Sequence, residues 1–202
     1  ASRLRQRKYG RGEAVFLHGD PGTSLFIVES GRIKVGFTST EGREVIFEIA
    51  NPGDEFGELA LLDGEPRSTD AVAIEPSVLL LLHREDFTYH LERRPRVALQ
   101  LLAVLSRRLR RNAELMQDAV FLDVPARLAR TILRLAADDT ATQEGGRPLT
   151  PHLYQSDLAG IVGTTRETLN KWLGIYETQG MIRLVKGRIA VLDAEALRRR
   201  IY

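Results

Sequence analysis

The residues best suited to binding chemistry lie at positions 56–69, where one carboxylate, one guanidinium and one hydroxyl interrupt a half-apolar segment. Gly57 allows backbone amides to approach a ligand closely, and such amides can cradle an anion. Glu58 is a strong acceptor that suits a ribose hydroxyl, while Arg67 can hold a phosphate with paired donors. Ser68 adds a hydroxyl donor. The segment favours a phosphorylated sugar as ligand, and the alternative is a surface ion pair between Glu58 and Arg67.

A second group of polar residues lies at positions 156–175, in a pattern that predicts two short helices joined by a tight turn. Small apolar residues at 158–162 predict the first amphipathic helix. Gly163 then allows the left-handed backbone that such a turn needs. Thr164 with Glu167 three residues later has capping-box spacing for the second helix. The pattern is typical of a helix-turn-helix, and the alternative is an ordinary helical hairpin with a solvated charged face.

The outward side chains of the second helix suit the edges of DNA bases. Arg166 can bond bidentately to guanine, Glu167 can accept from N4 of cytosine, and Lys171 can reach guanine or a phosphate. A hairpin with a Lys-Gly turn follows, and its basic residues could contact backbone phosphates. The expected core-side residues of the second helix are Leu169, Trp172, Leu173 and Tyr176. The DNA-contacting candidates are Gln155, Thr165, Arg166, Glu167, Asn170, Lys171, Lys186 and Arg188.

Short strands separated by glycine turns are predicted from residue 11 to residue 82. These runs are rich in β-branched and aromatic residues, and their regular spacing is typical of a sandwich or barrel. The polar segment at 56–69 therefore belongs to a β domain. The expected strands are residues 14–17, 25–28, 32–37, 45–49 and 78–82.

The pattern changes to a helical period over residues 94–122. Pro95 suits the first turn of this helix, whose length would be about 40 Å at 1.5 Å per residue. A helix this long with a narrow apolar stripe usually needs a partner helix. We therefore expect a homodimer seam, and the alternative is that the stripe packs on the barrel of its own chain. The stripe consists of Val97, Leu101, Leu105, Leu109, Leu115 or Met116, and Ala119.

Residues 121–125 interrupt the long helix and predict a hinge, which a second helix follows at about residues 126–137. Residues 138–148 are polar and contain glycine, which predicts a surface loop. The fold is therefore expected to be α+β. Its predicted parts are a β domain at 1–93, the long helix at 94–122, and a winged helix-turn-helix at 123–202.

The composition excludes several kinds of protein. The chain has no cysteine, so disulfides, cysteine-ligated iron–sulfur clusters and thiol sensing are excluded, and a cytoplasmic location is expected. No apolar run reaches about 18 residues, so no membrane span is expected. The net charge of +2 is too small to indicate nucleic acid by itself.

Catalysis and metal binding have little support in the sequence. No nucleophile–base pair is evident, so the chain is not expected to be an enzyme. A cupin-type metal enzyme is a minor alternative, but it needs clustered histidine and carboxylate ligands. The four histidines are scattered and give no haem or metal signal; they are His18, His83, His90 and His152.

Over nearly its whole length the sequence resembles the cyclic AMP receptor protein family, also called the CRP/FNR regulators. The resemblance rests on residues 56–69, which match the phosphate-binding cassette, on 121–124 at the hinge, and on 161–168 in the helix-turn-helix. It implies a jelly-roll cyclic-nucleotide-binding β-barrel, a long dimerisation helix and a C-terminal winged helix-turn-helix. It also implies a homodimeric regulator that binds a palindromic site in double-stranded DNA under control by cyclic AMP.

The resemblance implies roles for single residues. The cassette glycine and glutamate of cyclic AMP binders serve the ligand's backbone and ribose edges, which here points to Gly57 and Glu58. The family's arginine and following serine hold the cyclic phosphate, which points to Arg67 and Ser68. The apolar residues between them line the ligand pocket. The candidate ligand-binding residues are Gly57, Glu58, Leu59, Ala60, Arg67, Ser68 and Asn112.

One departure from the family leaves the base of the nucleotide open. Adenine is met in the family by two adjacent hydroxyl residues on the long helix, one from each subunit. Asn112 and Ala113 occupy these positions here. Asn112 can still bond to N6 or N1 of adenine, whereas the side chain of Ala113 cannot. Cyclic di-GMP, another small effector, or no effector at all are the alternatives to cyclic AMP.

The resemblance also implies contacts with DNA and with RNA polymerase. The family's base-reading arginine and glutamate fall on Arg166 and Glu167. Its second arginine falls on Lys171, which lacks the planar guanidinium and should discriminate less at that base. The loop at 138–148 lies where family members can touch RNA polymerase. The candidates for that contact are Thr142, Gln143 and Glu144.

Overall fold

The computed structural model describes residues 4–138, 143–144 and 147–201, which group into two compact units. The first unit comprises Ala1–Ser39 and Ile46–Asn112, and the second comprises Thr40–Val45 and Ala113–Tyr202. The 27-residue helix α3 (Pro95–Phe121) begins in the first unit and ends in the second. Within the described residues, no helix combines the length and the apolar character needed to cross a membrane.

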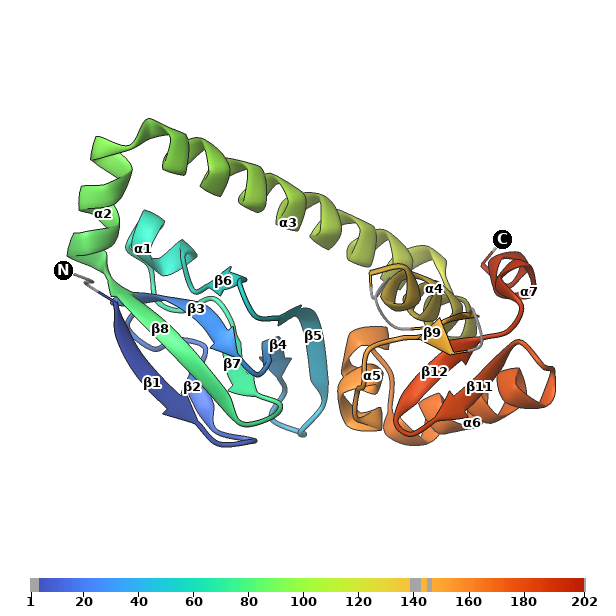
Figure 1. Ribbon diagram of the computed structural model, residues 1–202. Helices are drawn as coiled ribbons and strands as arrows, with labels where there is room; N and C mark the ends of the chain where they lie inside the picture. The colour runs from blue at the N-terminus through green and yellow to red at the C-terminus, as the bar shows by residue number, and fades with distance from the viewer. Residues whose placement is uncertain (1–3, 139–142, 145–146, 202) are drawn as a thin grey trace. The chain divides into compact units, whose positions relative to one another are not determined.

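Eight strands between residues 5 and 83 form two four-stranded sheets, ordered β1-β8-β3-β6 and β2-β7-β4-β5 (Figure 1). The pairs β1–β8, β3–β8, β3–β6, β2–β7 and β4–β7 are antiparallel. Two such sheets are the arrangement of a jelly roll, as predicted. The strands are β1 (Arg5–Tyr9), β2 (Ala14–Phe16), β3 (Ser24–Ser30), β4 (Ile33–Thr38), β5 (Glu44–Ala50), β6 (Glu55–Phe56), β7 (Asp70–Ala73) and β8 (Ser77–His83).

Aromatic side chains from both sheets form the centre of the barrel core. The rings of Phe16, Phe26 and Phe56 have centroids 5.4–5.9 Å apart, and all three are buried. Burial of each such side chain stabilises the fold by about 1.5–3 kcal/mol. Phe56 ends β6 immediately before Gly57. The core therefore anchors the start of the cassette.

The first strand, β1, differs from the sequence-based prediction, which expects no strand at residues 5–9. Four of its five residues are exposed and only Tyr9 is buried, so the segment lacks the apolar alternation of a half-buried strand. Its conformation depends on β8, with Arg5 opposite Leu81 and Tyr9 opposite Ser77. Charged side chains are common on edge strands, where they oppose pairing with other chains.

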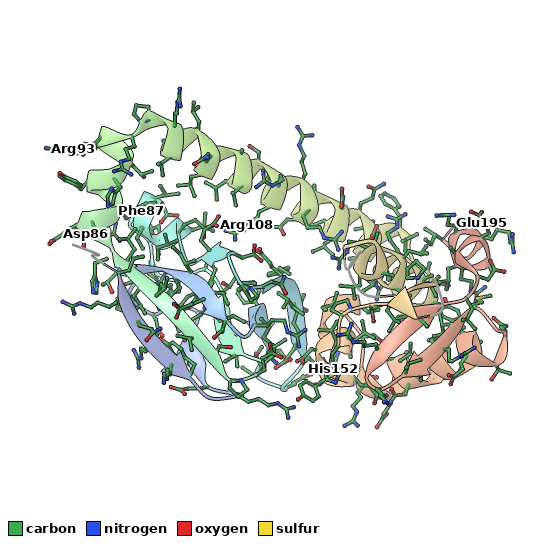
Figure 2. The ribbon with its side chains drawn as sticks, in the orientation of Figure 1. Asp86, Phe87, Arg93, Arg108, His152 and Glu195 are labelled. Atoms are coloured by element: carbon green, nitrogen blue, oxygen red, sulfur yellow. The ribbon has the colours of Figure 1, made fainter. Side chains whose placement is uncertain are left out.

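Three helices complete the first unit: α1 (Leu59–Asp63), α2 (Arg84–Arg93) and the first part of α3. Leu25, Leu61 and Phe87 form a small buried cluster, and Leu101 of α3 packs against it. Phe87 is seen on α2 in Figure 2. At Leu101 the helix therefore packs on the barrel of its own chain, which is the alternative to a homodimer seam. Leu109, by contrast, is 71% exposed. The chain itself covers only part of the predicted stripe: Leu101, Leu105 and Leu115 are half-buried, whereas Val97, Leu109, Met116 and Ala119 are exposed.

Helices and a hairpin pack around one core in the second unit. Its fully buried side chains include Leu128 and Ile132 of α4 and Tyr176 of α6. The predicted loop at 138–148 instead contains the short antiparallel pair β9–β10. The elements are α4 (Val124–Asp138), β9 (Gln143–Glu144), β10 (Arg147–Pro148), α5 (Gln155–Val162), α6 (Arg166–Thr178), β11 (Ile182–Val185), β12 (Arg188–Val191) and α7 (Ala194–Arg199).

Candidate functional site

The cassette starts at Phe56, the last residue of β6, runs through α1 and ends before β7. Gly57 has a φ of 80°, a left-handed conformation that suits glycine. Glu58 and Arg67 are 3% and 4% exposed, although each carries a charge. Ala60 is buried, whereas Leu59 and Ser68 are exposed. Because burying a charge without partners is costly, the partners of the two buried residues define the site.

The guanidinium of Arg67 lies in a cage of carbonyl groups and aromatic rings. Nη1 donates to the carbonyl oxygen of Gly57 at 2.6 Å, and Nη2 donates to that of Ser24 at 2.6 Å. The guanidinium carbon lies 4.2 Å from the centre of the Phe16 ring. Nε is buried and has no hydrogen-bond partner among the described residues. Burial lowers the pKa of the guanidinium, so an anion beside it would restore favourable interactions for its charge.

Gly57 lies so close to this guanidinium that a side chain at position 57 would displace it. A Cβ atom there would approach Nη1 of Arg67 to 2.7 Å and Cε1 of Phe16 to 3.2 Å. The sequence argument expected a close approach of the backbone to a ligand. The structure shows a close approach of the backbone to Arg67, whose position Gly57 therefore permits.

Glu58 pairs with Arg108 of α3. Oε1 of Glu58 lies 2.8 Å from Nη1 of Arg108, and Oε2 of Glu48 lies 3.0 Å from its Nε. Burial opposes the charge on Arg108, but the carboxylates of Glu58 and Glu48 together raise the pKa of its guanidinium. Burial likewise raises the pKa of Glu48, against the effect of Arg108. The alternative of an exposed Glu58–Arg67 ion pair is wrong, since both residues are buried and Glu58 pairs with Arg108.

Arg108 is a site residue that the sequence reasoning missed. The available signal was its position four residues before Asn112, which places the two side chains on one face of α3. Figure 2 shows Arg108 on the side of α3 that faces the barrel strands of the first unit. Asn112 itself is exposed.

The helix-turn-helix is formed by α5, Gly163 and α6. Gly163 adopts a φ of 69° at the end of α5, as the turn requires. The cap of α6 is Thr165, whose hydroxyl accepts from the backbone N–H of Thr168 at 3.2 Å. The predicted cap at Thr164 is wrong, because the N–H of Thr164 still bonds to the carbonyl of Ala159 in the turn that ends α5.

The second helix of this motif, α6, presents the predicted residues to solvent. Leu169, Leu173 and Tyr176 are buried on its inner face, whereas Trp172 is only half-buried. The hydroxyl of Tyr176 donates to the carbonyl of Pro125 at 2.7 Å, which fixes α6 to the start of α4. The exposed candidates on and near α6 are Gln155, Thr165, Arg166, Glu167, Asn170 and Lys171.

The wing is the hairpin of β11 and β12. Its two-residue turn has positive φ at Lys186 and Gly187, 46° and 78°, as in a type I′ turn. A Cβ on Gly187 would approach Nε2 of His152 to 2.5 Å, so the turn packs closely on that ring. Lys186 is exposed, while Arg188 is half-buried and has a partner within the chain.

Arg127 joins two helix ends at the hinge. Its Nη1 donates to the carbonyl of Leu122 at 2.8 Å, just after α3, and its Nε donates to that of Val162 at 3.0 Å, at the end of α5. The carboxylate of Asp123 accepts from the N–H of Ala126 at 2.9 Å and caps α4. The helix break predicted at 121–125 is therefore present between Phe121 and Val124, and Arg127 ties it to the end of α5.

Other predicted features take ordinary roles or fall outside the description. His18 contacts the ring of Phe37, and Nδ1 of His83 lies 3.1 Å from the hydroxyl of Ser24. No cluster of three potential metal ligands occurs among the residues that the structure describes. Thr142, one of the candidates for RNA polymerase contact, lies outside the described residues; the other two, at 143–144, form β9.

Two family models match the chain. The Cyclic nucleotide-binding domain matches residues 6–94, and the Crp-like helix-turn-helix domain matches residues 126–200. The first range contains the whole cassette, and the second contains the hairpin and α6. Each model therefore matches the part of the chain in which the corresponding geometry is found.

Similarity to known regulators covers nearly the whole chain. The CRP-like cAMP-activated global transcriptional regulator of Mycobacterium tuberculosis is 40% identical over 193 residues, 95% of this chain and 86% of that protein. The Cyclic AMP receptor protein of Thermus thermophilus is 36% identical over 197 residues, 97% and 88% of the two chains. The solved structure of the c-di-GMP responsive global regulator CLP of Xanthomonas campestris has a TM-score of 0.82 at 22% identity, covers 94% of each chain, and supports the fold. The chain therefore belongs to the CRP/FNR family of DNA-binding transcription regulators.

Proposed function

We propose that this regulator binds cyclic AMP at its cassette and that the bound nucleotide raises its affinity for DNA. The observation that carries the proposal is the buried Nε–H of Arg67, which has no hydrogen-bond partner among the described residues. An unsatisfied buried donor costs about 1–3 kcal/mol, more on a charged group, and a phosphate oxygen would remove that cost. The two relatives described above are named for cyclic AMP, which supports this choice of nucleotide.

The remaining cassette groups suit the rest of the nucleotide. Ser68 is exposed and can add a hydroxyl donor to the phosphate. A carboxylate accepts several hydrogen bonds, so the pairing of Glu58 with Arg108 leaves capacity for a ribose hydroxyl. Gly57, Leu59 and Ala60 complete the proposed contact surface. We assign Asn112, exposed on α3, to the base.

We also propose that α3 forms the seam of a homodimer. Seven residues on α3 follow the alternating spacing of three and four that is typical of a coiled-coil core. All seven are exposed, so nothing within the described chain covers them. They are Leu99, Leu102, Ser106, Leu109, Ala113, Met116 and Val120. Dimeric helix-turn-helix proteins place two recognition helices one DNA turn apart, about 34 Å, which suits a palindromic site.

Within this proposal α6 enters the major groove and the wing lies along the backbone. Arg166 and Glu167 would contact base edges, and Lys171 a base or a phosphate. Gln155, Thr165, Asn170, Lys186 and Arg188 complete the proposed DNA surface. The proposal includes a division of the chain into domains at 1–93, 94–122 and 123–202. It also includes a cytoplasmic location and a contact between residues 138–148 and RNA polymerase.

Fluorescence anisotropy of a labelled palindromic duplex, with and without cyclic AMP, tests the proposed function. Cyclic AMP should tighten specific binding, and the matched variant Arg67→Ala should lose both nucleotide binding by calorimetry and the tightening on DNA. A panel of nucleotides scored by thermal stability separates the alternatives. If cyclic di-GMP alone stabilised the protein, it would replace cyclic AMP as the proposed effector. DNA binding that no nucleotide changes would overturn the proposed control of DNA binding by a ligand.

A further inference from the structure

Arg84, the first residue of α2, binds three main-chain carbonyl groups around the cassette. Its Nη1 donates to Leu61 at 3.0 Å, and its Nη2 donates to Ala60 at 2.7 Å and to Gly22 at 2.9 Å. Two of these carbonyls belong to α1, and the third belongs to the loop before β3. One half-buried side chain of α2 thus joins α1 and the loop before β3.

The helix α1 needs such support from outside itself. It has five residues, and helices this short are unstable alone because nucleation costs more than the few hydrogen bonds return. The last four carbonyls of any helix lack partners within it, and they carry the negative end of its dipole. Arg84 supplies charged donors to two of these carbonyls, Ala60 and Leu61. Arg84 therefore adds to the left-handed Gly64, with a φ of 81°, at which α1 ends.

The same contact reaches the environment of Arg67. A Cβ on Gly22 would approach the Cβ of Ala60 to 2.1 Å and Nε of Arg67 to 3.6 Å, so these three groups are packed together. The next two residues are held in turn. The carbonyl of Thr23 accepts from the backbone N–H of Arg84 at 3.0 Å, and that of Ser24 accepts from Arg67.

The three hydrogen bonds of the Arg84 guanidinium described above all go to main-chain carbonyls, and its charge acts on the guanidinium of Arg67. Burial, and to a smaller extent the charge of Arg84, lower the pKa of Arg67. A positive charge beside Arg67 could act on an anionic ligand through its field alone or through the geometry of the three carbonyls. A lysine keeps the charge but lacks the planar fork, so it separates the two effects.

We infer that Arg84 is a positioning residue for nucleotide binding, which holds α1 and Gly22 in the arrangement that places Arg67 Nε for the phosphate. This inference rests on the proposed cyclic nucleotide function. Arg84 opens α2, which leads after Arg94 into α3, so the same side chain ties the cassette to the start of the helical segment.

Calorimetric titration with cyclic AMP and amide hydrogen exchange on the full chain test the inference. Arg84→Ala should weaken cyclic AMP binding by about tenfold or more, because three charge-assisted hydrogen bonds are lost. Exchange at the amides of Leu61 and Leu62 should accelerate in the unliganded protein. Arg84→Lys should remain weak, since one ammonium cannot keep the fork geometry.

The matched control is Arg32→Ala, which removes another half-buried arginine of the barrel, paired with Glu75 at 2.8 Å. It should lower the thermal midpoint without changing cyclic AMP affinity. Wild-type affinity in Arg84→Ala, or full rescue by Arg84→Lys, would overturn the positioning role. A wild-type chain that binds no nucleotide would instead overturn the proposed function, and hydrogen exchange would still decide whether Arg84 holds α1.

Discussion

At the scale of single residues, Gly57 meets two requirements that only glycine satisfies together. Its φ is 80°, where a side chain costs about 1–2 kcal/mol in strain. It also lies against Nη1 of Arg67, where a Cβ would approach to 2.7 Å. Gly12 has the same φ of 80°, but a Cβ there would meet nothing within 4 Å. Alanine substitutions at the two glycines therefore separate the effect of backbone strain from the effect of displacing Arg67.

Gly57→Ala should weaken cyclic AMP binding by at least about tenfold, since 1.4 kcal/mol is a factor of ten and both strain and displacement act at the site. Gly12→Ala should lower the free energy of unfolding, because it introduces a similar backbone strain, but should keep the wild-type affinity for cyclic AMP. Calorimetry and chemical denaturation measure the two quantities. Equal affinities in the two variants would show that Gly57 does not control the position of Arg67.

Glu48 gives the pH dependence of stability a definite sign. Burial raises its pKa in the folded protein, so its contribution to stability is present below the unfolded value and is lost as pH rises through the folded value. Glu48→Gln stays neutral at every pH. The free energy of unfolding of Glu48→Gln minus that of wild type should therefore increase as pH rises above the ordinary glutamate pKa of about 4.3.

Denaturation at a series of pH values measures this difference. Glu41→Gln, which removes the same charge from an exposed side chain, controls for the change in net charge. A difference for Glu48→Gln that falls over the range would mean that the ion pair with Arg108 outweighs burial.

At the scale of elements, the start of α6 depends on one hydroxyl. Thr165→Ala removes the acceptor for the N–H of Thr168 and should cost about 1 kcal/mol of unfolding free energy. Thr164→Ala should cost much less, because Thr164 is not the cap. Denaturation without DNA measures both, which keeps the result independent of any DNA contact by Thr165. A larger loss for Thr164→Ala would restore the capping box expected from the sequence.

At the scale of the whole molecule, assembly depends on the exposed face of α3. Leu109 is 71% exposed in the chain and lies at the middle of the proposed seam. Leu109→Glu should produce a monomer, because a charge at a core position of paired helices must be buried without a partner. Gln117→Glu, the same change in charge on an exposed residue outside the seam, should leave the dimer intact.

Sedimentation velocity over a range of concentrations distinguishes the two states. A Leu109→Glu protein that sediments like wild type would place the dimer interface elsewhere. Loss of specific DNA binding together with loss of the dimer would link assembly to the reading of a palindromic site. Retained binding of equal affinity by the monomer would contradict that link.

The sequence by itself determined the barrel, the long helix, the break that follows it and the helix-turn-helix. Local signals carry these features, since strand and helix periods and turn glycines act over a few residues. Gly163 is one example, because its φ of 69° follows from the short turn between α5 and α6. The cassette was found in the same way, from the residue types within one short segment.

The tertiary structure alone decided the partners of the charged groups. Glu58 binds Arg108, fifty residues away in the chain, and Arg84 caps α1 from the start of α2. Such pairs depend on which backbones the fold brings together, and residue type in one sequence does not specify them. The strand β1 has the same origin, because pairing with β8 outweighs its polar composition. Arg67 was therefore a candidate from the sequence, but its cage, and the lack of a hydrogen-bond partner for its Nε among the described residues, were decided by the fold.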